Sequence, residues 1–203
     1  MFYKISKLFR VQHVHDVIEC LTAALEAKDI YTSGHSSRVA AMSFDLARSM
    51  GIKGVMLEDI HIAAHLHDIG KMGVPENILN KKGKLLPHEW TQIQRHPEIG
   101  YAILSKSRQL DKIAEMVLYH HERWDGKGYP HALKKDKIPL GSRIIAVADG
   151  IDAMTSARPY REAMSWEDCM EEVLLNKELQ FDPVVVEAAL RIWKKWEYQP
   201  KAS

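Results

Sequence analysis

The chain has 203 residues and a formal net charge of +1, from 28 Lys and Arg against 27 Asp and Glu. A hydrophobic fraction of 46% with 27% charged residues is typical of one soluble globular domain and excludes a disordered chain. Because the charges balance, no global field attracts a nucleic-acid polymer or an anionic membrane, and we expect neither DNA nor RNA as a partner. Any phosphate chemistry must therefore use local cations or metal ions.

The two cysteines, Cys20 and Cys169, lie far apart and outside any CxxC pattern. This excludes a disulfide framework and favours a cytoplasmic location. No apolar run approaches the roughly 20 residues that a transmembrane helix needs. We predict an N-terminal extension over residues 1–10, one domain over 11–198 and a C-terminal tail over 199–203.

Helical patterns begin near the N-terminus and continue along most of the chain. A second helix is expected after Thr32-Ser33-Gly34, ending at Gly51, and a third from Val55 to about Ile69. A later helix is expected over residues 110–121. The buried stripe of the first predicted helix consists of apolar residues spaced by three and four, namely Val14, Val17, Ile18, Leu21, Ala24 and Leu25.

Further helix starts are indicated by residues that favour a first turn or its cap. They are Pro87, Pro97, Ser165 with Asp168, and Asp182-Pro183. No segment alternates strictly enough for a strand, and two segments, Asn80–Lys84 and Trp124–Gly141, are predicted as loops from their glycines, prolines and lysines. The second loop leaves room for a small hairpin. The fold class is therefore all-α, a helical bundle with one long loop that contains Gly and Pro.

Histidines and aspartates that can ligate metals recur across the predicted helices. They are His35, His67-Asp68, His96, His120-His121 and Asp149. Isolated buried histidines would each need a separate hydrogen-bond partner, whereas convergence on metal ions explains all of them together. A ligand set of imidazoles and carboxylates suits Fe, Mn, Ni or Zn ions. The absence of cysteine ligands is evidence against a closed structural zinc site. We expect an open, hydrolytic metal site.

The motifs around these residues closely resemble HD-GYP domains, which belong to the HD superfamily of metal-dependent phosphohydrolases. The matching segments are 35–39, 65–71, 82–85, 95–100, 120–130, 148–149 and 154–161. The resemblance extends from about Leu21 to Leu190 and includes Gly128-Tyr129-Pro130, which many other HD hydrolases lack. It implies an HD-domain helical bundle.

The resemblance also implies how the ligands divide between two divalent ions, with Fe or Mn favoured over Ni or Zn. Asp68 would bridge the ions. Some family members have a glutamate four residues before the first ligand and bind a third ion, but Tyr31 occupies that position here, which favours two. The ligands of the first ion would be His35, His67, Asp68 and Asp149, and those of the second Asp68, His96, His120 and His121.

By the same resemblance, the chain would hydrolyse cyclic di-GMP to linear pGpG, GMP or both, through attack by a hydroxide that bridges the ions. Asp68 and Lys71 are the predicted catalytic residues. Lys71 would also face a substrate phosphate, Arg158 and Arg161 would contact phosphate, and Tyr129 would shape the nucleotide pocket. The simpler alternatives are a solvated lysine, arginines in salt bridges and a tyrosine that holds the loop on the bundle.

Three other functions stay open at this point. The chain could hydrolyse cyclic GMP-AMP, or act on a dNTP or guanosine polyphosphate like other HD hydrolases. It could also be a non-catalytic cyclic-dinucleotide sensor, although retention of every ligand favours catalysis. Regulation could come from a signalling-protein partner, and the sequence does not give the oligomeric state.

The other histidines receive simpler assignments. His61 and His65 share one face of the helix that carries His67, but they point away from it, and we assign His65 to packing or to support of the site. The remaining histidines are predicted at the surface, namely His13, His15, His88 and His131.

Overall fold

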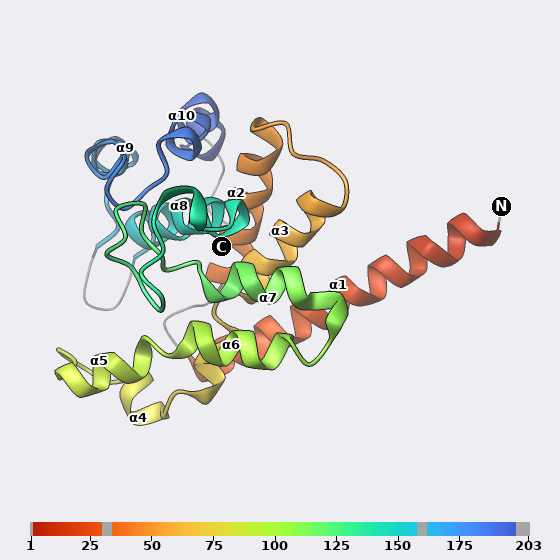
Figure 1. The fold of residues 1–203 in the computed structure, drawn as a ribbon, viewed down its shortest axis with the longest axis horizontal. Helices are drawn as coiled ribbons and strands as arrows, with labels where there is room; N and C mark the ends of the chain where they lie inside the picture. Colours follow the sequence, from red (N-terminus) through yellow and green to blue (C-terminus); the bar gives the residue numbers. More distant parts are fainter. Residues whose placement is uncertain (1, 30–33, 158–161, 198–203) are drawn as a thin grey trace.

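The computed structural model describes residues 2–29, 34–157 and 162–197, and these form an all-α bundle without a β-strand (Figure 1). The predicted fold class is confirmed. The α-helices are α1 (Phe2–Lys28), α2 (His35–Ser49), α3 (Val55–Leu66), α4 (Glu76–Leu79), α5 (Pro87–Ile93), α6 (His96–Leu104), α7 (Asp111–Leu118), α8 (Leu140–Thr155), α9 (Trp166–Leu175) and α10 (Pro183–Glu197). The 3₁₀ helices are η1 (Ile69–Gly73), η2 (Arg108–Leu110) and η3 (Lys135–Lys137).

The hydrophobic core lies where α2 and α3 pack against α7, α8 and α10. Its side chains come from all five helices, so burial of apolar area holds distant parts of the sequence together. Fully buried members include Leu46, Ile60, Val117, Ile145 and Val186. This rigid bundle is the support for the polar residues described below.

The predicted end of α2 at Gly51 is confirmed. Gly51 has a φ of 81°, in the left-handed region that glycine adopts without strain. Its amide donates to the carbonyl of Arg48 at 3.0 Å, and the Ile52 amide donates to Ala47 at 3.0 Å. These two bonds form a Schellman motif, which satisfies the last carbonyls of the helix.

Two predicted helices are shorter than expected, and both end at metal-ligand candidates. α3 ends at Leu66 rather than near Ile69, because the backbone tightens at Asp68 into η1, where the Lys71 amide donates to the Asp68 carbonyl at 2.8 Å. α7 ends at Leu118, so His120 and His121 follow the helix instead of lying on it. Asp68, His120 and His121 therefore lie in turns at the ends of helices rather than within the helices.

The predicted stripe of α1 is partly wrong. Ile18 and Leu25 are buried, but Val17 and Leu21 are 59% and 43% exposed, and polar Thr22 lies in the buried row. The reason is that α1 contacts the bundle along one narrow strip, against α3 and η1. Only the row of Ile18, Thr22 and Leu25 therefore faces inward. Val14 lies outside the residues whose side chains are described.

α1 runs without interruption from Phe2, so residues 2–10 continue the helix that follows them and project from the bundle in Figure 1. The domain boundaries at residues 10 and 198 stay predictions. Within the described ranges, none of the helices combines the length and apolar character that crossing a bilayer requires.

The C-terminal end of α1 is tied to η1 by hydrogen bonds. The Lys28 ammonium donates to the carbonyls of Met72 at 2.6 Å and Val74 at 2.9 Å, and the Asn80 amide donates to the Lys28 carbonyl at 2.9 Å. The end of α1 is therefore joined directly to the segment that follows Asp68.

The predicted helix starts at Ser165 and Asp182-Pro183 are confirmed. The Ser165 hydroxyl accepts from the Asp168 amide at 3.0 Å, and the Asp182 carboxylate accepts from the Val184 amide at 2.8 Å. The hairpin considered for the long loop is wrong for the described chain, because the loop contains only the short η3 as regular structure.

Gly70 allows η1 to lie directly against α6. A Cβ at this position would overlap the carbonyl oxygen of His96 and the backbone of Gly100. Since the backbones meet without a side chain between them, the turn that carries Asp68 lies next to the helix that begins with His96. This contact is one reason why two ligand candidates far apart in sequence meet in space.

Candidate metal centre

A first ligand group consists of His35, His67 and Asp149, which come from the start of α2, the end of α3 and the middle of α8. One ligand atom of each lies within 4.8 Å of the others. His35 Nε2 is 3.3 Å from His67 Nε2 and 3.4 Å from Asp149 Oδ1. Both histidines are buried, whereas the Asp149 side chain keeps 21% of its area exposed.

A second ligand group consists of Asp68, His96, His120 and His121, again with ligand atoms within 4.8 Å of one another. His96 Nε2 lies 3.3 Å from both His120 Nε2 and Asp68 Oδ1. The rings of His120 and His121 are 4.0 Å apart at their centroids. Adjacent residues in one turn therefore supply two imidazoles to the same small volume.

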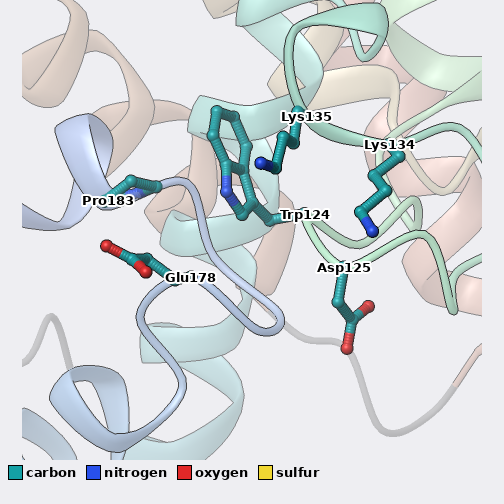
Figure 2. Close-up of a pocket in the computed structure, with 6 residues that line it drawn as sticks. All are labelled: Trp124, Asp125, Lys134, Lys135, Glu178 and Pro183. Carbon is teal, nitrogen blue, oxygen red and sulfur yellow. The ribbon is translucent and has the colours of Figure 1, made fainter.

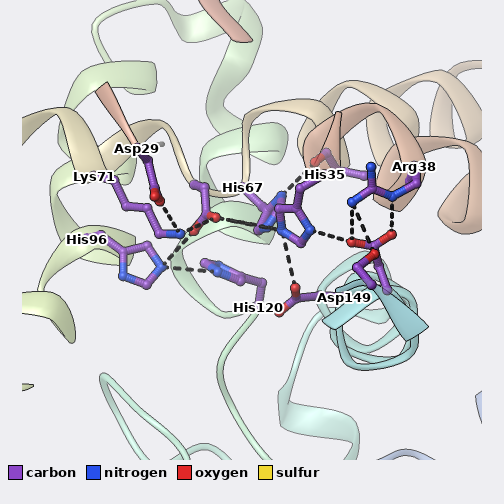
Figure 3. Close-up of polar contacts among 12 residues, drawn as sticks. Asp29, His35, Arg38, His67, Lys71, His96, His120 and Asp149 are labelled. Carbon is purple, nitrogen blue, oxygen red and sulfur yellow. Dashed lines mark hydrogen bonds and ion pairs between the residues drawn. The ribbon is translucent and has the colours of Figure 1, made fainter. Parts of the chain in front are cut away.

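Asp68 lies between the two groups. Its Oδ2 is 3.5 Å from His67 Nε2 and 3.8 Å from His35 Nε2, while its Oδ1 faces His96. Figure 3 shows how these three histidines lie. Each carboxylate oxygen thus faces one ligand group. The structure brings all seven predicted ligand residues together, in the two sets that the resemblance implies.

The orientation of the rings fits metal ions. Nδ1 of His67, His96 and His120 lies 2.6–2.7 Å from the carbonyl oxygens of Ala64, Ile93 and Val117. A carbonyl only accepts, so each Nδ1 carries the hydrogen and each Nε2 presents a lone pair. Two such lone pairs, from His96 and His120, face each other at 3.3 Å, an arrangement that a shared cation stabilises.

The electrostatics of the second group also suit metal binding, which requires neutral imidazoles. Burial, together with the neighbouring histidines, lowers the pKa of His120 well below its ordinary value and that of His121 to about 3. Burial opposes ionisation of Asp68, but the Lys71 ammonium and the surrounding histidines hold the Asp68 pKa well below its usual range. The group therefore presents neutral nitrogens and a charged carboxylate.

We expect the chelated, metal-free protein to lose stability as the pH falls from about 7 to about 3. Burial lowers the pKa of His96, His120 and His121, so the unfolded chain, with histidine pKa values near 6.5, binds more protons in this window. His35 acts oppositely, since its hydrogen bond to Asp152 and nearby carboxylates outweigh burial and raise its pKa. Its stabilisation is present below pH 6.5 and is lost as the pH rises.

The measurement is the urea midpoint at several pH values in the presence of a chelator. His121→Gln removes one of the histidines with a lowered pKa, and we expect the midpoint to depend less on pH in this variant. A midpoint that is constant from pH 7 to pH 4 in the parent chain would contradict the prediction.

Two residues of the site were not predicted from the sequence. The Asp152 carboxylate, buried in α8, accepts from His35 Nδ1 at 2.7 Å, and the Arg38 guanidinium donates to Asp152 at 2.5 Å and 3.1 Å. The signal was present in the spacing, because Asp152 lies one turn after Asp149 and Arg38 one turn after His35. Asp152 fixes which nitrogen of His35 carries the hydrogen.

Replacing Asp152 with asparagine is expected to weaken metal binding at the first ligand group by about 10- to 100-fold, as is usual when the partner of a ligating histidine is lost. The amide can donate to His35 and so stabilise the wrong tautomer. Metal titration followed by elemental analysis measures the effect. An unchanged affinity would show that Arg38 and Asp152 form only a structural ion pair.

Lys71 is bound to two carboxylates rather than to solvent alone. Its Nζ lies 2.7 Å from Asp68 Oδ2 and 3.1 Å from Asp29 Oδ2, and the side chain is 17% exposed. Although burial disfavours the ammonium, these carboxylates raise its pKa above the ordinary value. Lys71 therefore stays cationic at the edge of the ligand groups. Its ammonium lies next to Asp68 Oδ2, the oxygen that faces His35 and His67 of the first ligand group.

The Gly128-Tyr129-Pro130 segment packs onto the turn that carries His121. A Cβ on Gly128 would overlap the backbone of residues 121–123, so this glycine permits contact with the turn itself. The Tyr129 ring lies 4.9 Å from the His121 ring, tilted by 32°. Glu122 supports the same loop by accepting from the His131 amide at 2.7 Å, as a loop organiser.

Three residues named from the sequence, Tyr31, Arg158 and Arg161, lie outside the described residues. A separate pocket of about 410 Å³ lies beside the long loop (Figure 2). None of its lining residues is a predicted metal ligand. They are Trp124, Asp125, Lys134, Lys135, Glu178 and Pro183.

Comparison with known proteins agrees with this geometry. A family model described as the HD domain matches residues 19–185. A cyclic di-GMP phosphodiesterase from Thermotoga maritima is 43% identical over 182 residues, which cover 89% of this chain and 50% of that protein. A 3'3'-cGAMP-specific phosphodiesterase from Vibrio cholerae is 39% identical over 183 residues, covering 89% of this chain and 35% of that protein. The chain thus spans half or less of the length of these relatives.

A solved structure, a cyclic GMP-AMP specific phosphodiesterase from V. cholerae, has the same fold, with a TM-score of 0.63 and 18% identity over 87% of this chain and 48% of that one. Because the HD domain model matches most of the chain, the chain belongs to the HD domain family. Within that family, the resemblance to HD-GYP domains is confirmed by the relatives and by their identity over most of the chain. Membership implies dependence on divalent metal ions, and the two ligand groups supply suitable donors.

Proposed function

We propose that this chain is a phosphodiesterase that hydrolyses cyclic di-GMP to linear pGpG, GMP or both. The observation that carries the proposal is the pair of adjacent ligand groups joined by the two oxygens of Asp68. A cyclic di-GMP phosphodiesterase that is 43% identical over most of the chain supports the choice of substrate.

The first ligand group with Asp68 would hold one divalent ion, and the second ligand group would hold the other. Imidazole and carboxylate donors without cysteine favour Fe or Mn, with Ni or Zn as alternatives. When bound, such a pair acidifies a water molecule to supply the nucleophile and offsets negative charge on the attacking and leaving oxygens. His120 and His121 are already neutral and Asp68 already ionised for this role.

Residues around the ligand groups would hold the substrate. The Lys71 ammonium would attract a phosphate oxygen, and Asp29 would keep it in place when Asp68 binds metal. Tyr129 lies against His121 and would border the nucleotide. Arg158 and Arg161 are proposed from the sequence as phosphate contacts, because the planar guanidinium suits phosphate oxygens. The cytoplasmic location and a signalling-protein partner stay predictions of the sequence.

A second candidate substrate is 3'3'-cGAMP. The observation that favours it is the 39% identity with a phosphodiesterase specific for that compound, over the same share of the chain. The two cyclic dinucleotides share a phosphodiester ring and differ in one base, so the metal ligands do not discriminate between them. Discrimination must come from the pocket around the bases.

The test is a timed product assay on anaerobically purified protein loaded with Mn²⁺ or Fe²⁺. Cyclic di-GMP, 3'3'-cGAMP, a dNTP and a guanosine polyphosphate are supplied separately, and products are separated by chromatography. We expect linear dinucleotide or mononucleotide from cyclic di-GMP. Release of triphosphate from the dNTP, or of pyrophosphate from the guanosine polyphosphate, without turnover of either cyclic dinucleotide would replace the proposal by another HD hydrolase. Stoichiometric binding without turnover would indicate a sensor.

A further inference from the structure

A third group of histidines lies outside the metal centre, between α1 and α3. His15 comes from α1, and His61 and His65 lie one turn apart on α3. One ring nitrogen of each lies within 4.8 Å of the others. We call these three residues the α1–α3 histidine cluster. His15, predicted as a surface residue, is partly exposed at 43% of its side chain but contacts both other rings.

The cluster is distinct from the two ligand groups. His65 and His67 are only two residues apart, but two residues on a helix turn the side chain by about 200°. They accordingly belong to different clusters in the structure. The proposed phosphodiesterase activity uses neither His15 nor His61.

The His61 ring points a lone pair at the ring of His15. His61 Nδ1 lies 3.2 Å from the carbonyl oxygen of Ala40, which only accepts, so His61 Nε2 presents a lone pair. His15 Nδ1 faces the Glu19 carboxylate at 3.5 Å, and its Nε2 lies 3.5 Å from His61 Nε2. His61 thus shares the arrangement of the metal-centre histidines, with Nδ1 on a carbonyl oxygen and Nε2 toward a second ring.

The third ring supplies an independent observation. His65 is only 5% exposed, and its Nδ1 is buried without a hydrogen-bond partner among the described residues. Leaving a buried polar nitrogen unpaired is costly, and a bound cation would remove this cost. Its ring meets His61 edge-on, with centroids 4.8 Å apart, and also meets His15 edge-on at 5.5 Å.

We propose that His15, His61 and His65 bind one divalent transition-metal ion, and that zinc is the best fit. Three imidazoles with one open position form a familiar ligand set for tetrahedral zinc, and they disfavour Mg²⁺ and Ca²⁺, which prefer oxygen ligands. The partly exposed side of His15 gives the ion an entry path. The bound ion would clamp α1 onto α3.

The test compares zinc binding by the full chain with that of His15→Ala, using Zn²⁺ alone as the probe and elemental analysis after equilibrium dialysis. We expect the variant to bind one zinc ion fewer per chain at saturating zinc, or to bind that ion at least about 10-fold more weakly, since even losing the partner of a ligand costs this much. Phosphodiesterase turnover with Mn²⁺ should be unchanged, because His15 contacts no residue of the two ligand groups.

His61→Gln provides a second variant, and exposed His88, on α5, provides the matched control. His61→Gln should repeat the loss of zinc, whereas His88→Ala should bind zinc like the parent chain. Unchanged zinc stoichiometry and affinity in both cluster variants would overturn the proposal, as would an equal loss in His88→Ala. Circular dichroism checks folding, and if His61→Gln unfolds, the partly exposed His15 decides the outcome.

Discussion

Replacing Asp68 with asparagine is expected to remove most bound metal and to lower turnover by about 10³-fold or more. Charge stabilisation by metal ions contributes several kcal/mol at the transition state, and each 1.4 kcal/mol corresponds to a tenfold change in rate. Asparagine keeps the shape of the side chain but lacks the negative charge, and its amide group would place a donor where one of the two carboxylate oxygens faces histidine nitrogens. Both ligand groups are affected because Asp68 lies between them.

Metal content by elemental analysis and product formation from cyclic di-GMP measure this effect. Asp111→Asn serves as the matched control, because Asp111 is an exposed aspartate on α7 outside the ligand groups. The control should keep both metal and activity. If Asp68→Asn retained the metal content and turnover of the parent chain, Asp68 would not be the residue that joins the two groups.

Replacing Gly70 with alanine is expected to reduce the free energy of unfolding by about 3 kcal/mol, at the upper end of what overpacking costs. The added methyl would overlap the backbone of α6 at His96 and Gly100 rather than a movable side chain. To relieve the overlap, η1 and α6 must separate. This separation would also move His96 away from Asp68, so metal affinity at the second ligand group should fall as well.

Urea unfolding with and without Mn²⁺ separates the two consequences. Gly83→Ala is a useful comparison, because that position has a φ of 113° but nothing within 4 Å of an added Cβ. Strain alone should cost about 1 kcal/mol there, without a change in metal affinity. A Gly70→Ala protein as stable as Gly83→Ala would show that η1 and α6 can part at little cost.

The residues that meet in the two ligand groups could be predicted because their types and order are informative without coordinates. A His-Asp pair, a His-His pair and further single ligands on separate helices converge only in a few architectures, and the flanking motifs match one of them. The helical bundle was equally accessible, because capping residues such as Ser165 and stops such as Gly51 act locally, through the one or two backbone bonds that they form.

The features that could not be predicted from the sequence depend on tertiary contacts. Asp152 lies one turn after Asp149, but its hydrogen bond to His35, 117 residues away in the sequence, exists only in the folded bundle. The inward face of α1 includes Thr22 and excludes Val17. When a helix packs along one edge of a bundle, the neighbouring elements decide which of its faces is buried, and the hydrophobic pattern of the helix alone does not. The contacts of Gly128 with the preceding turn likewise require the folded loop.

The ammonium of Lys28 donates to the carbonyl oxygens of Met72 and Val74, so the end of α1 and the segment after Asp68 would move together. Asp29, the next residue, holds Lys71 from the same side. A small rotation or axial shift of α1 would therefore be transmitted through two consecutive side chains to the cation beside Asp68. We therefore expect the position of α1 to determine where the Lys71 ammonium lies relative to Asp68.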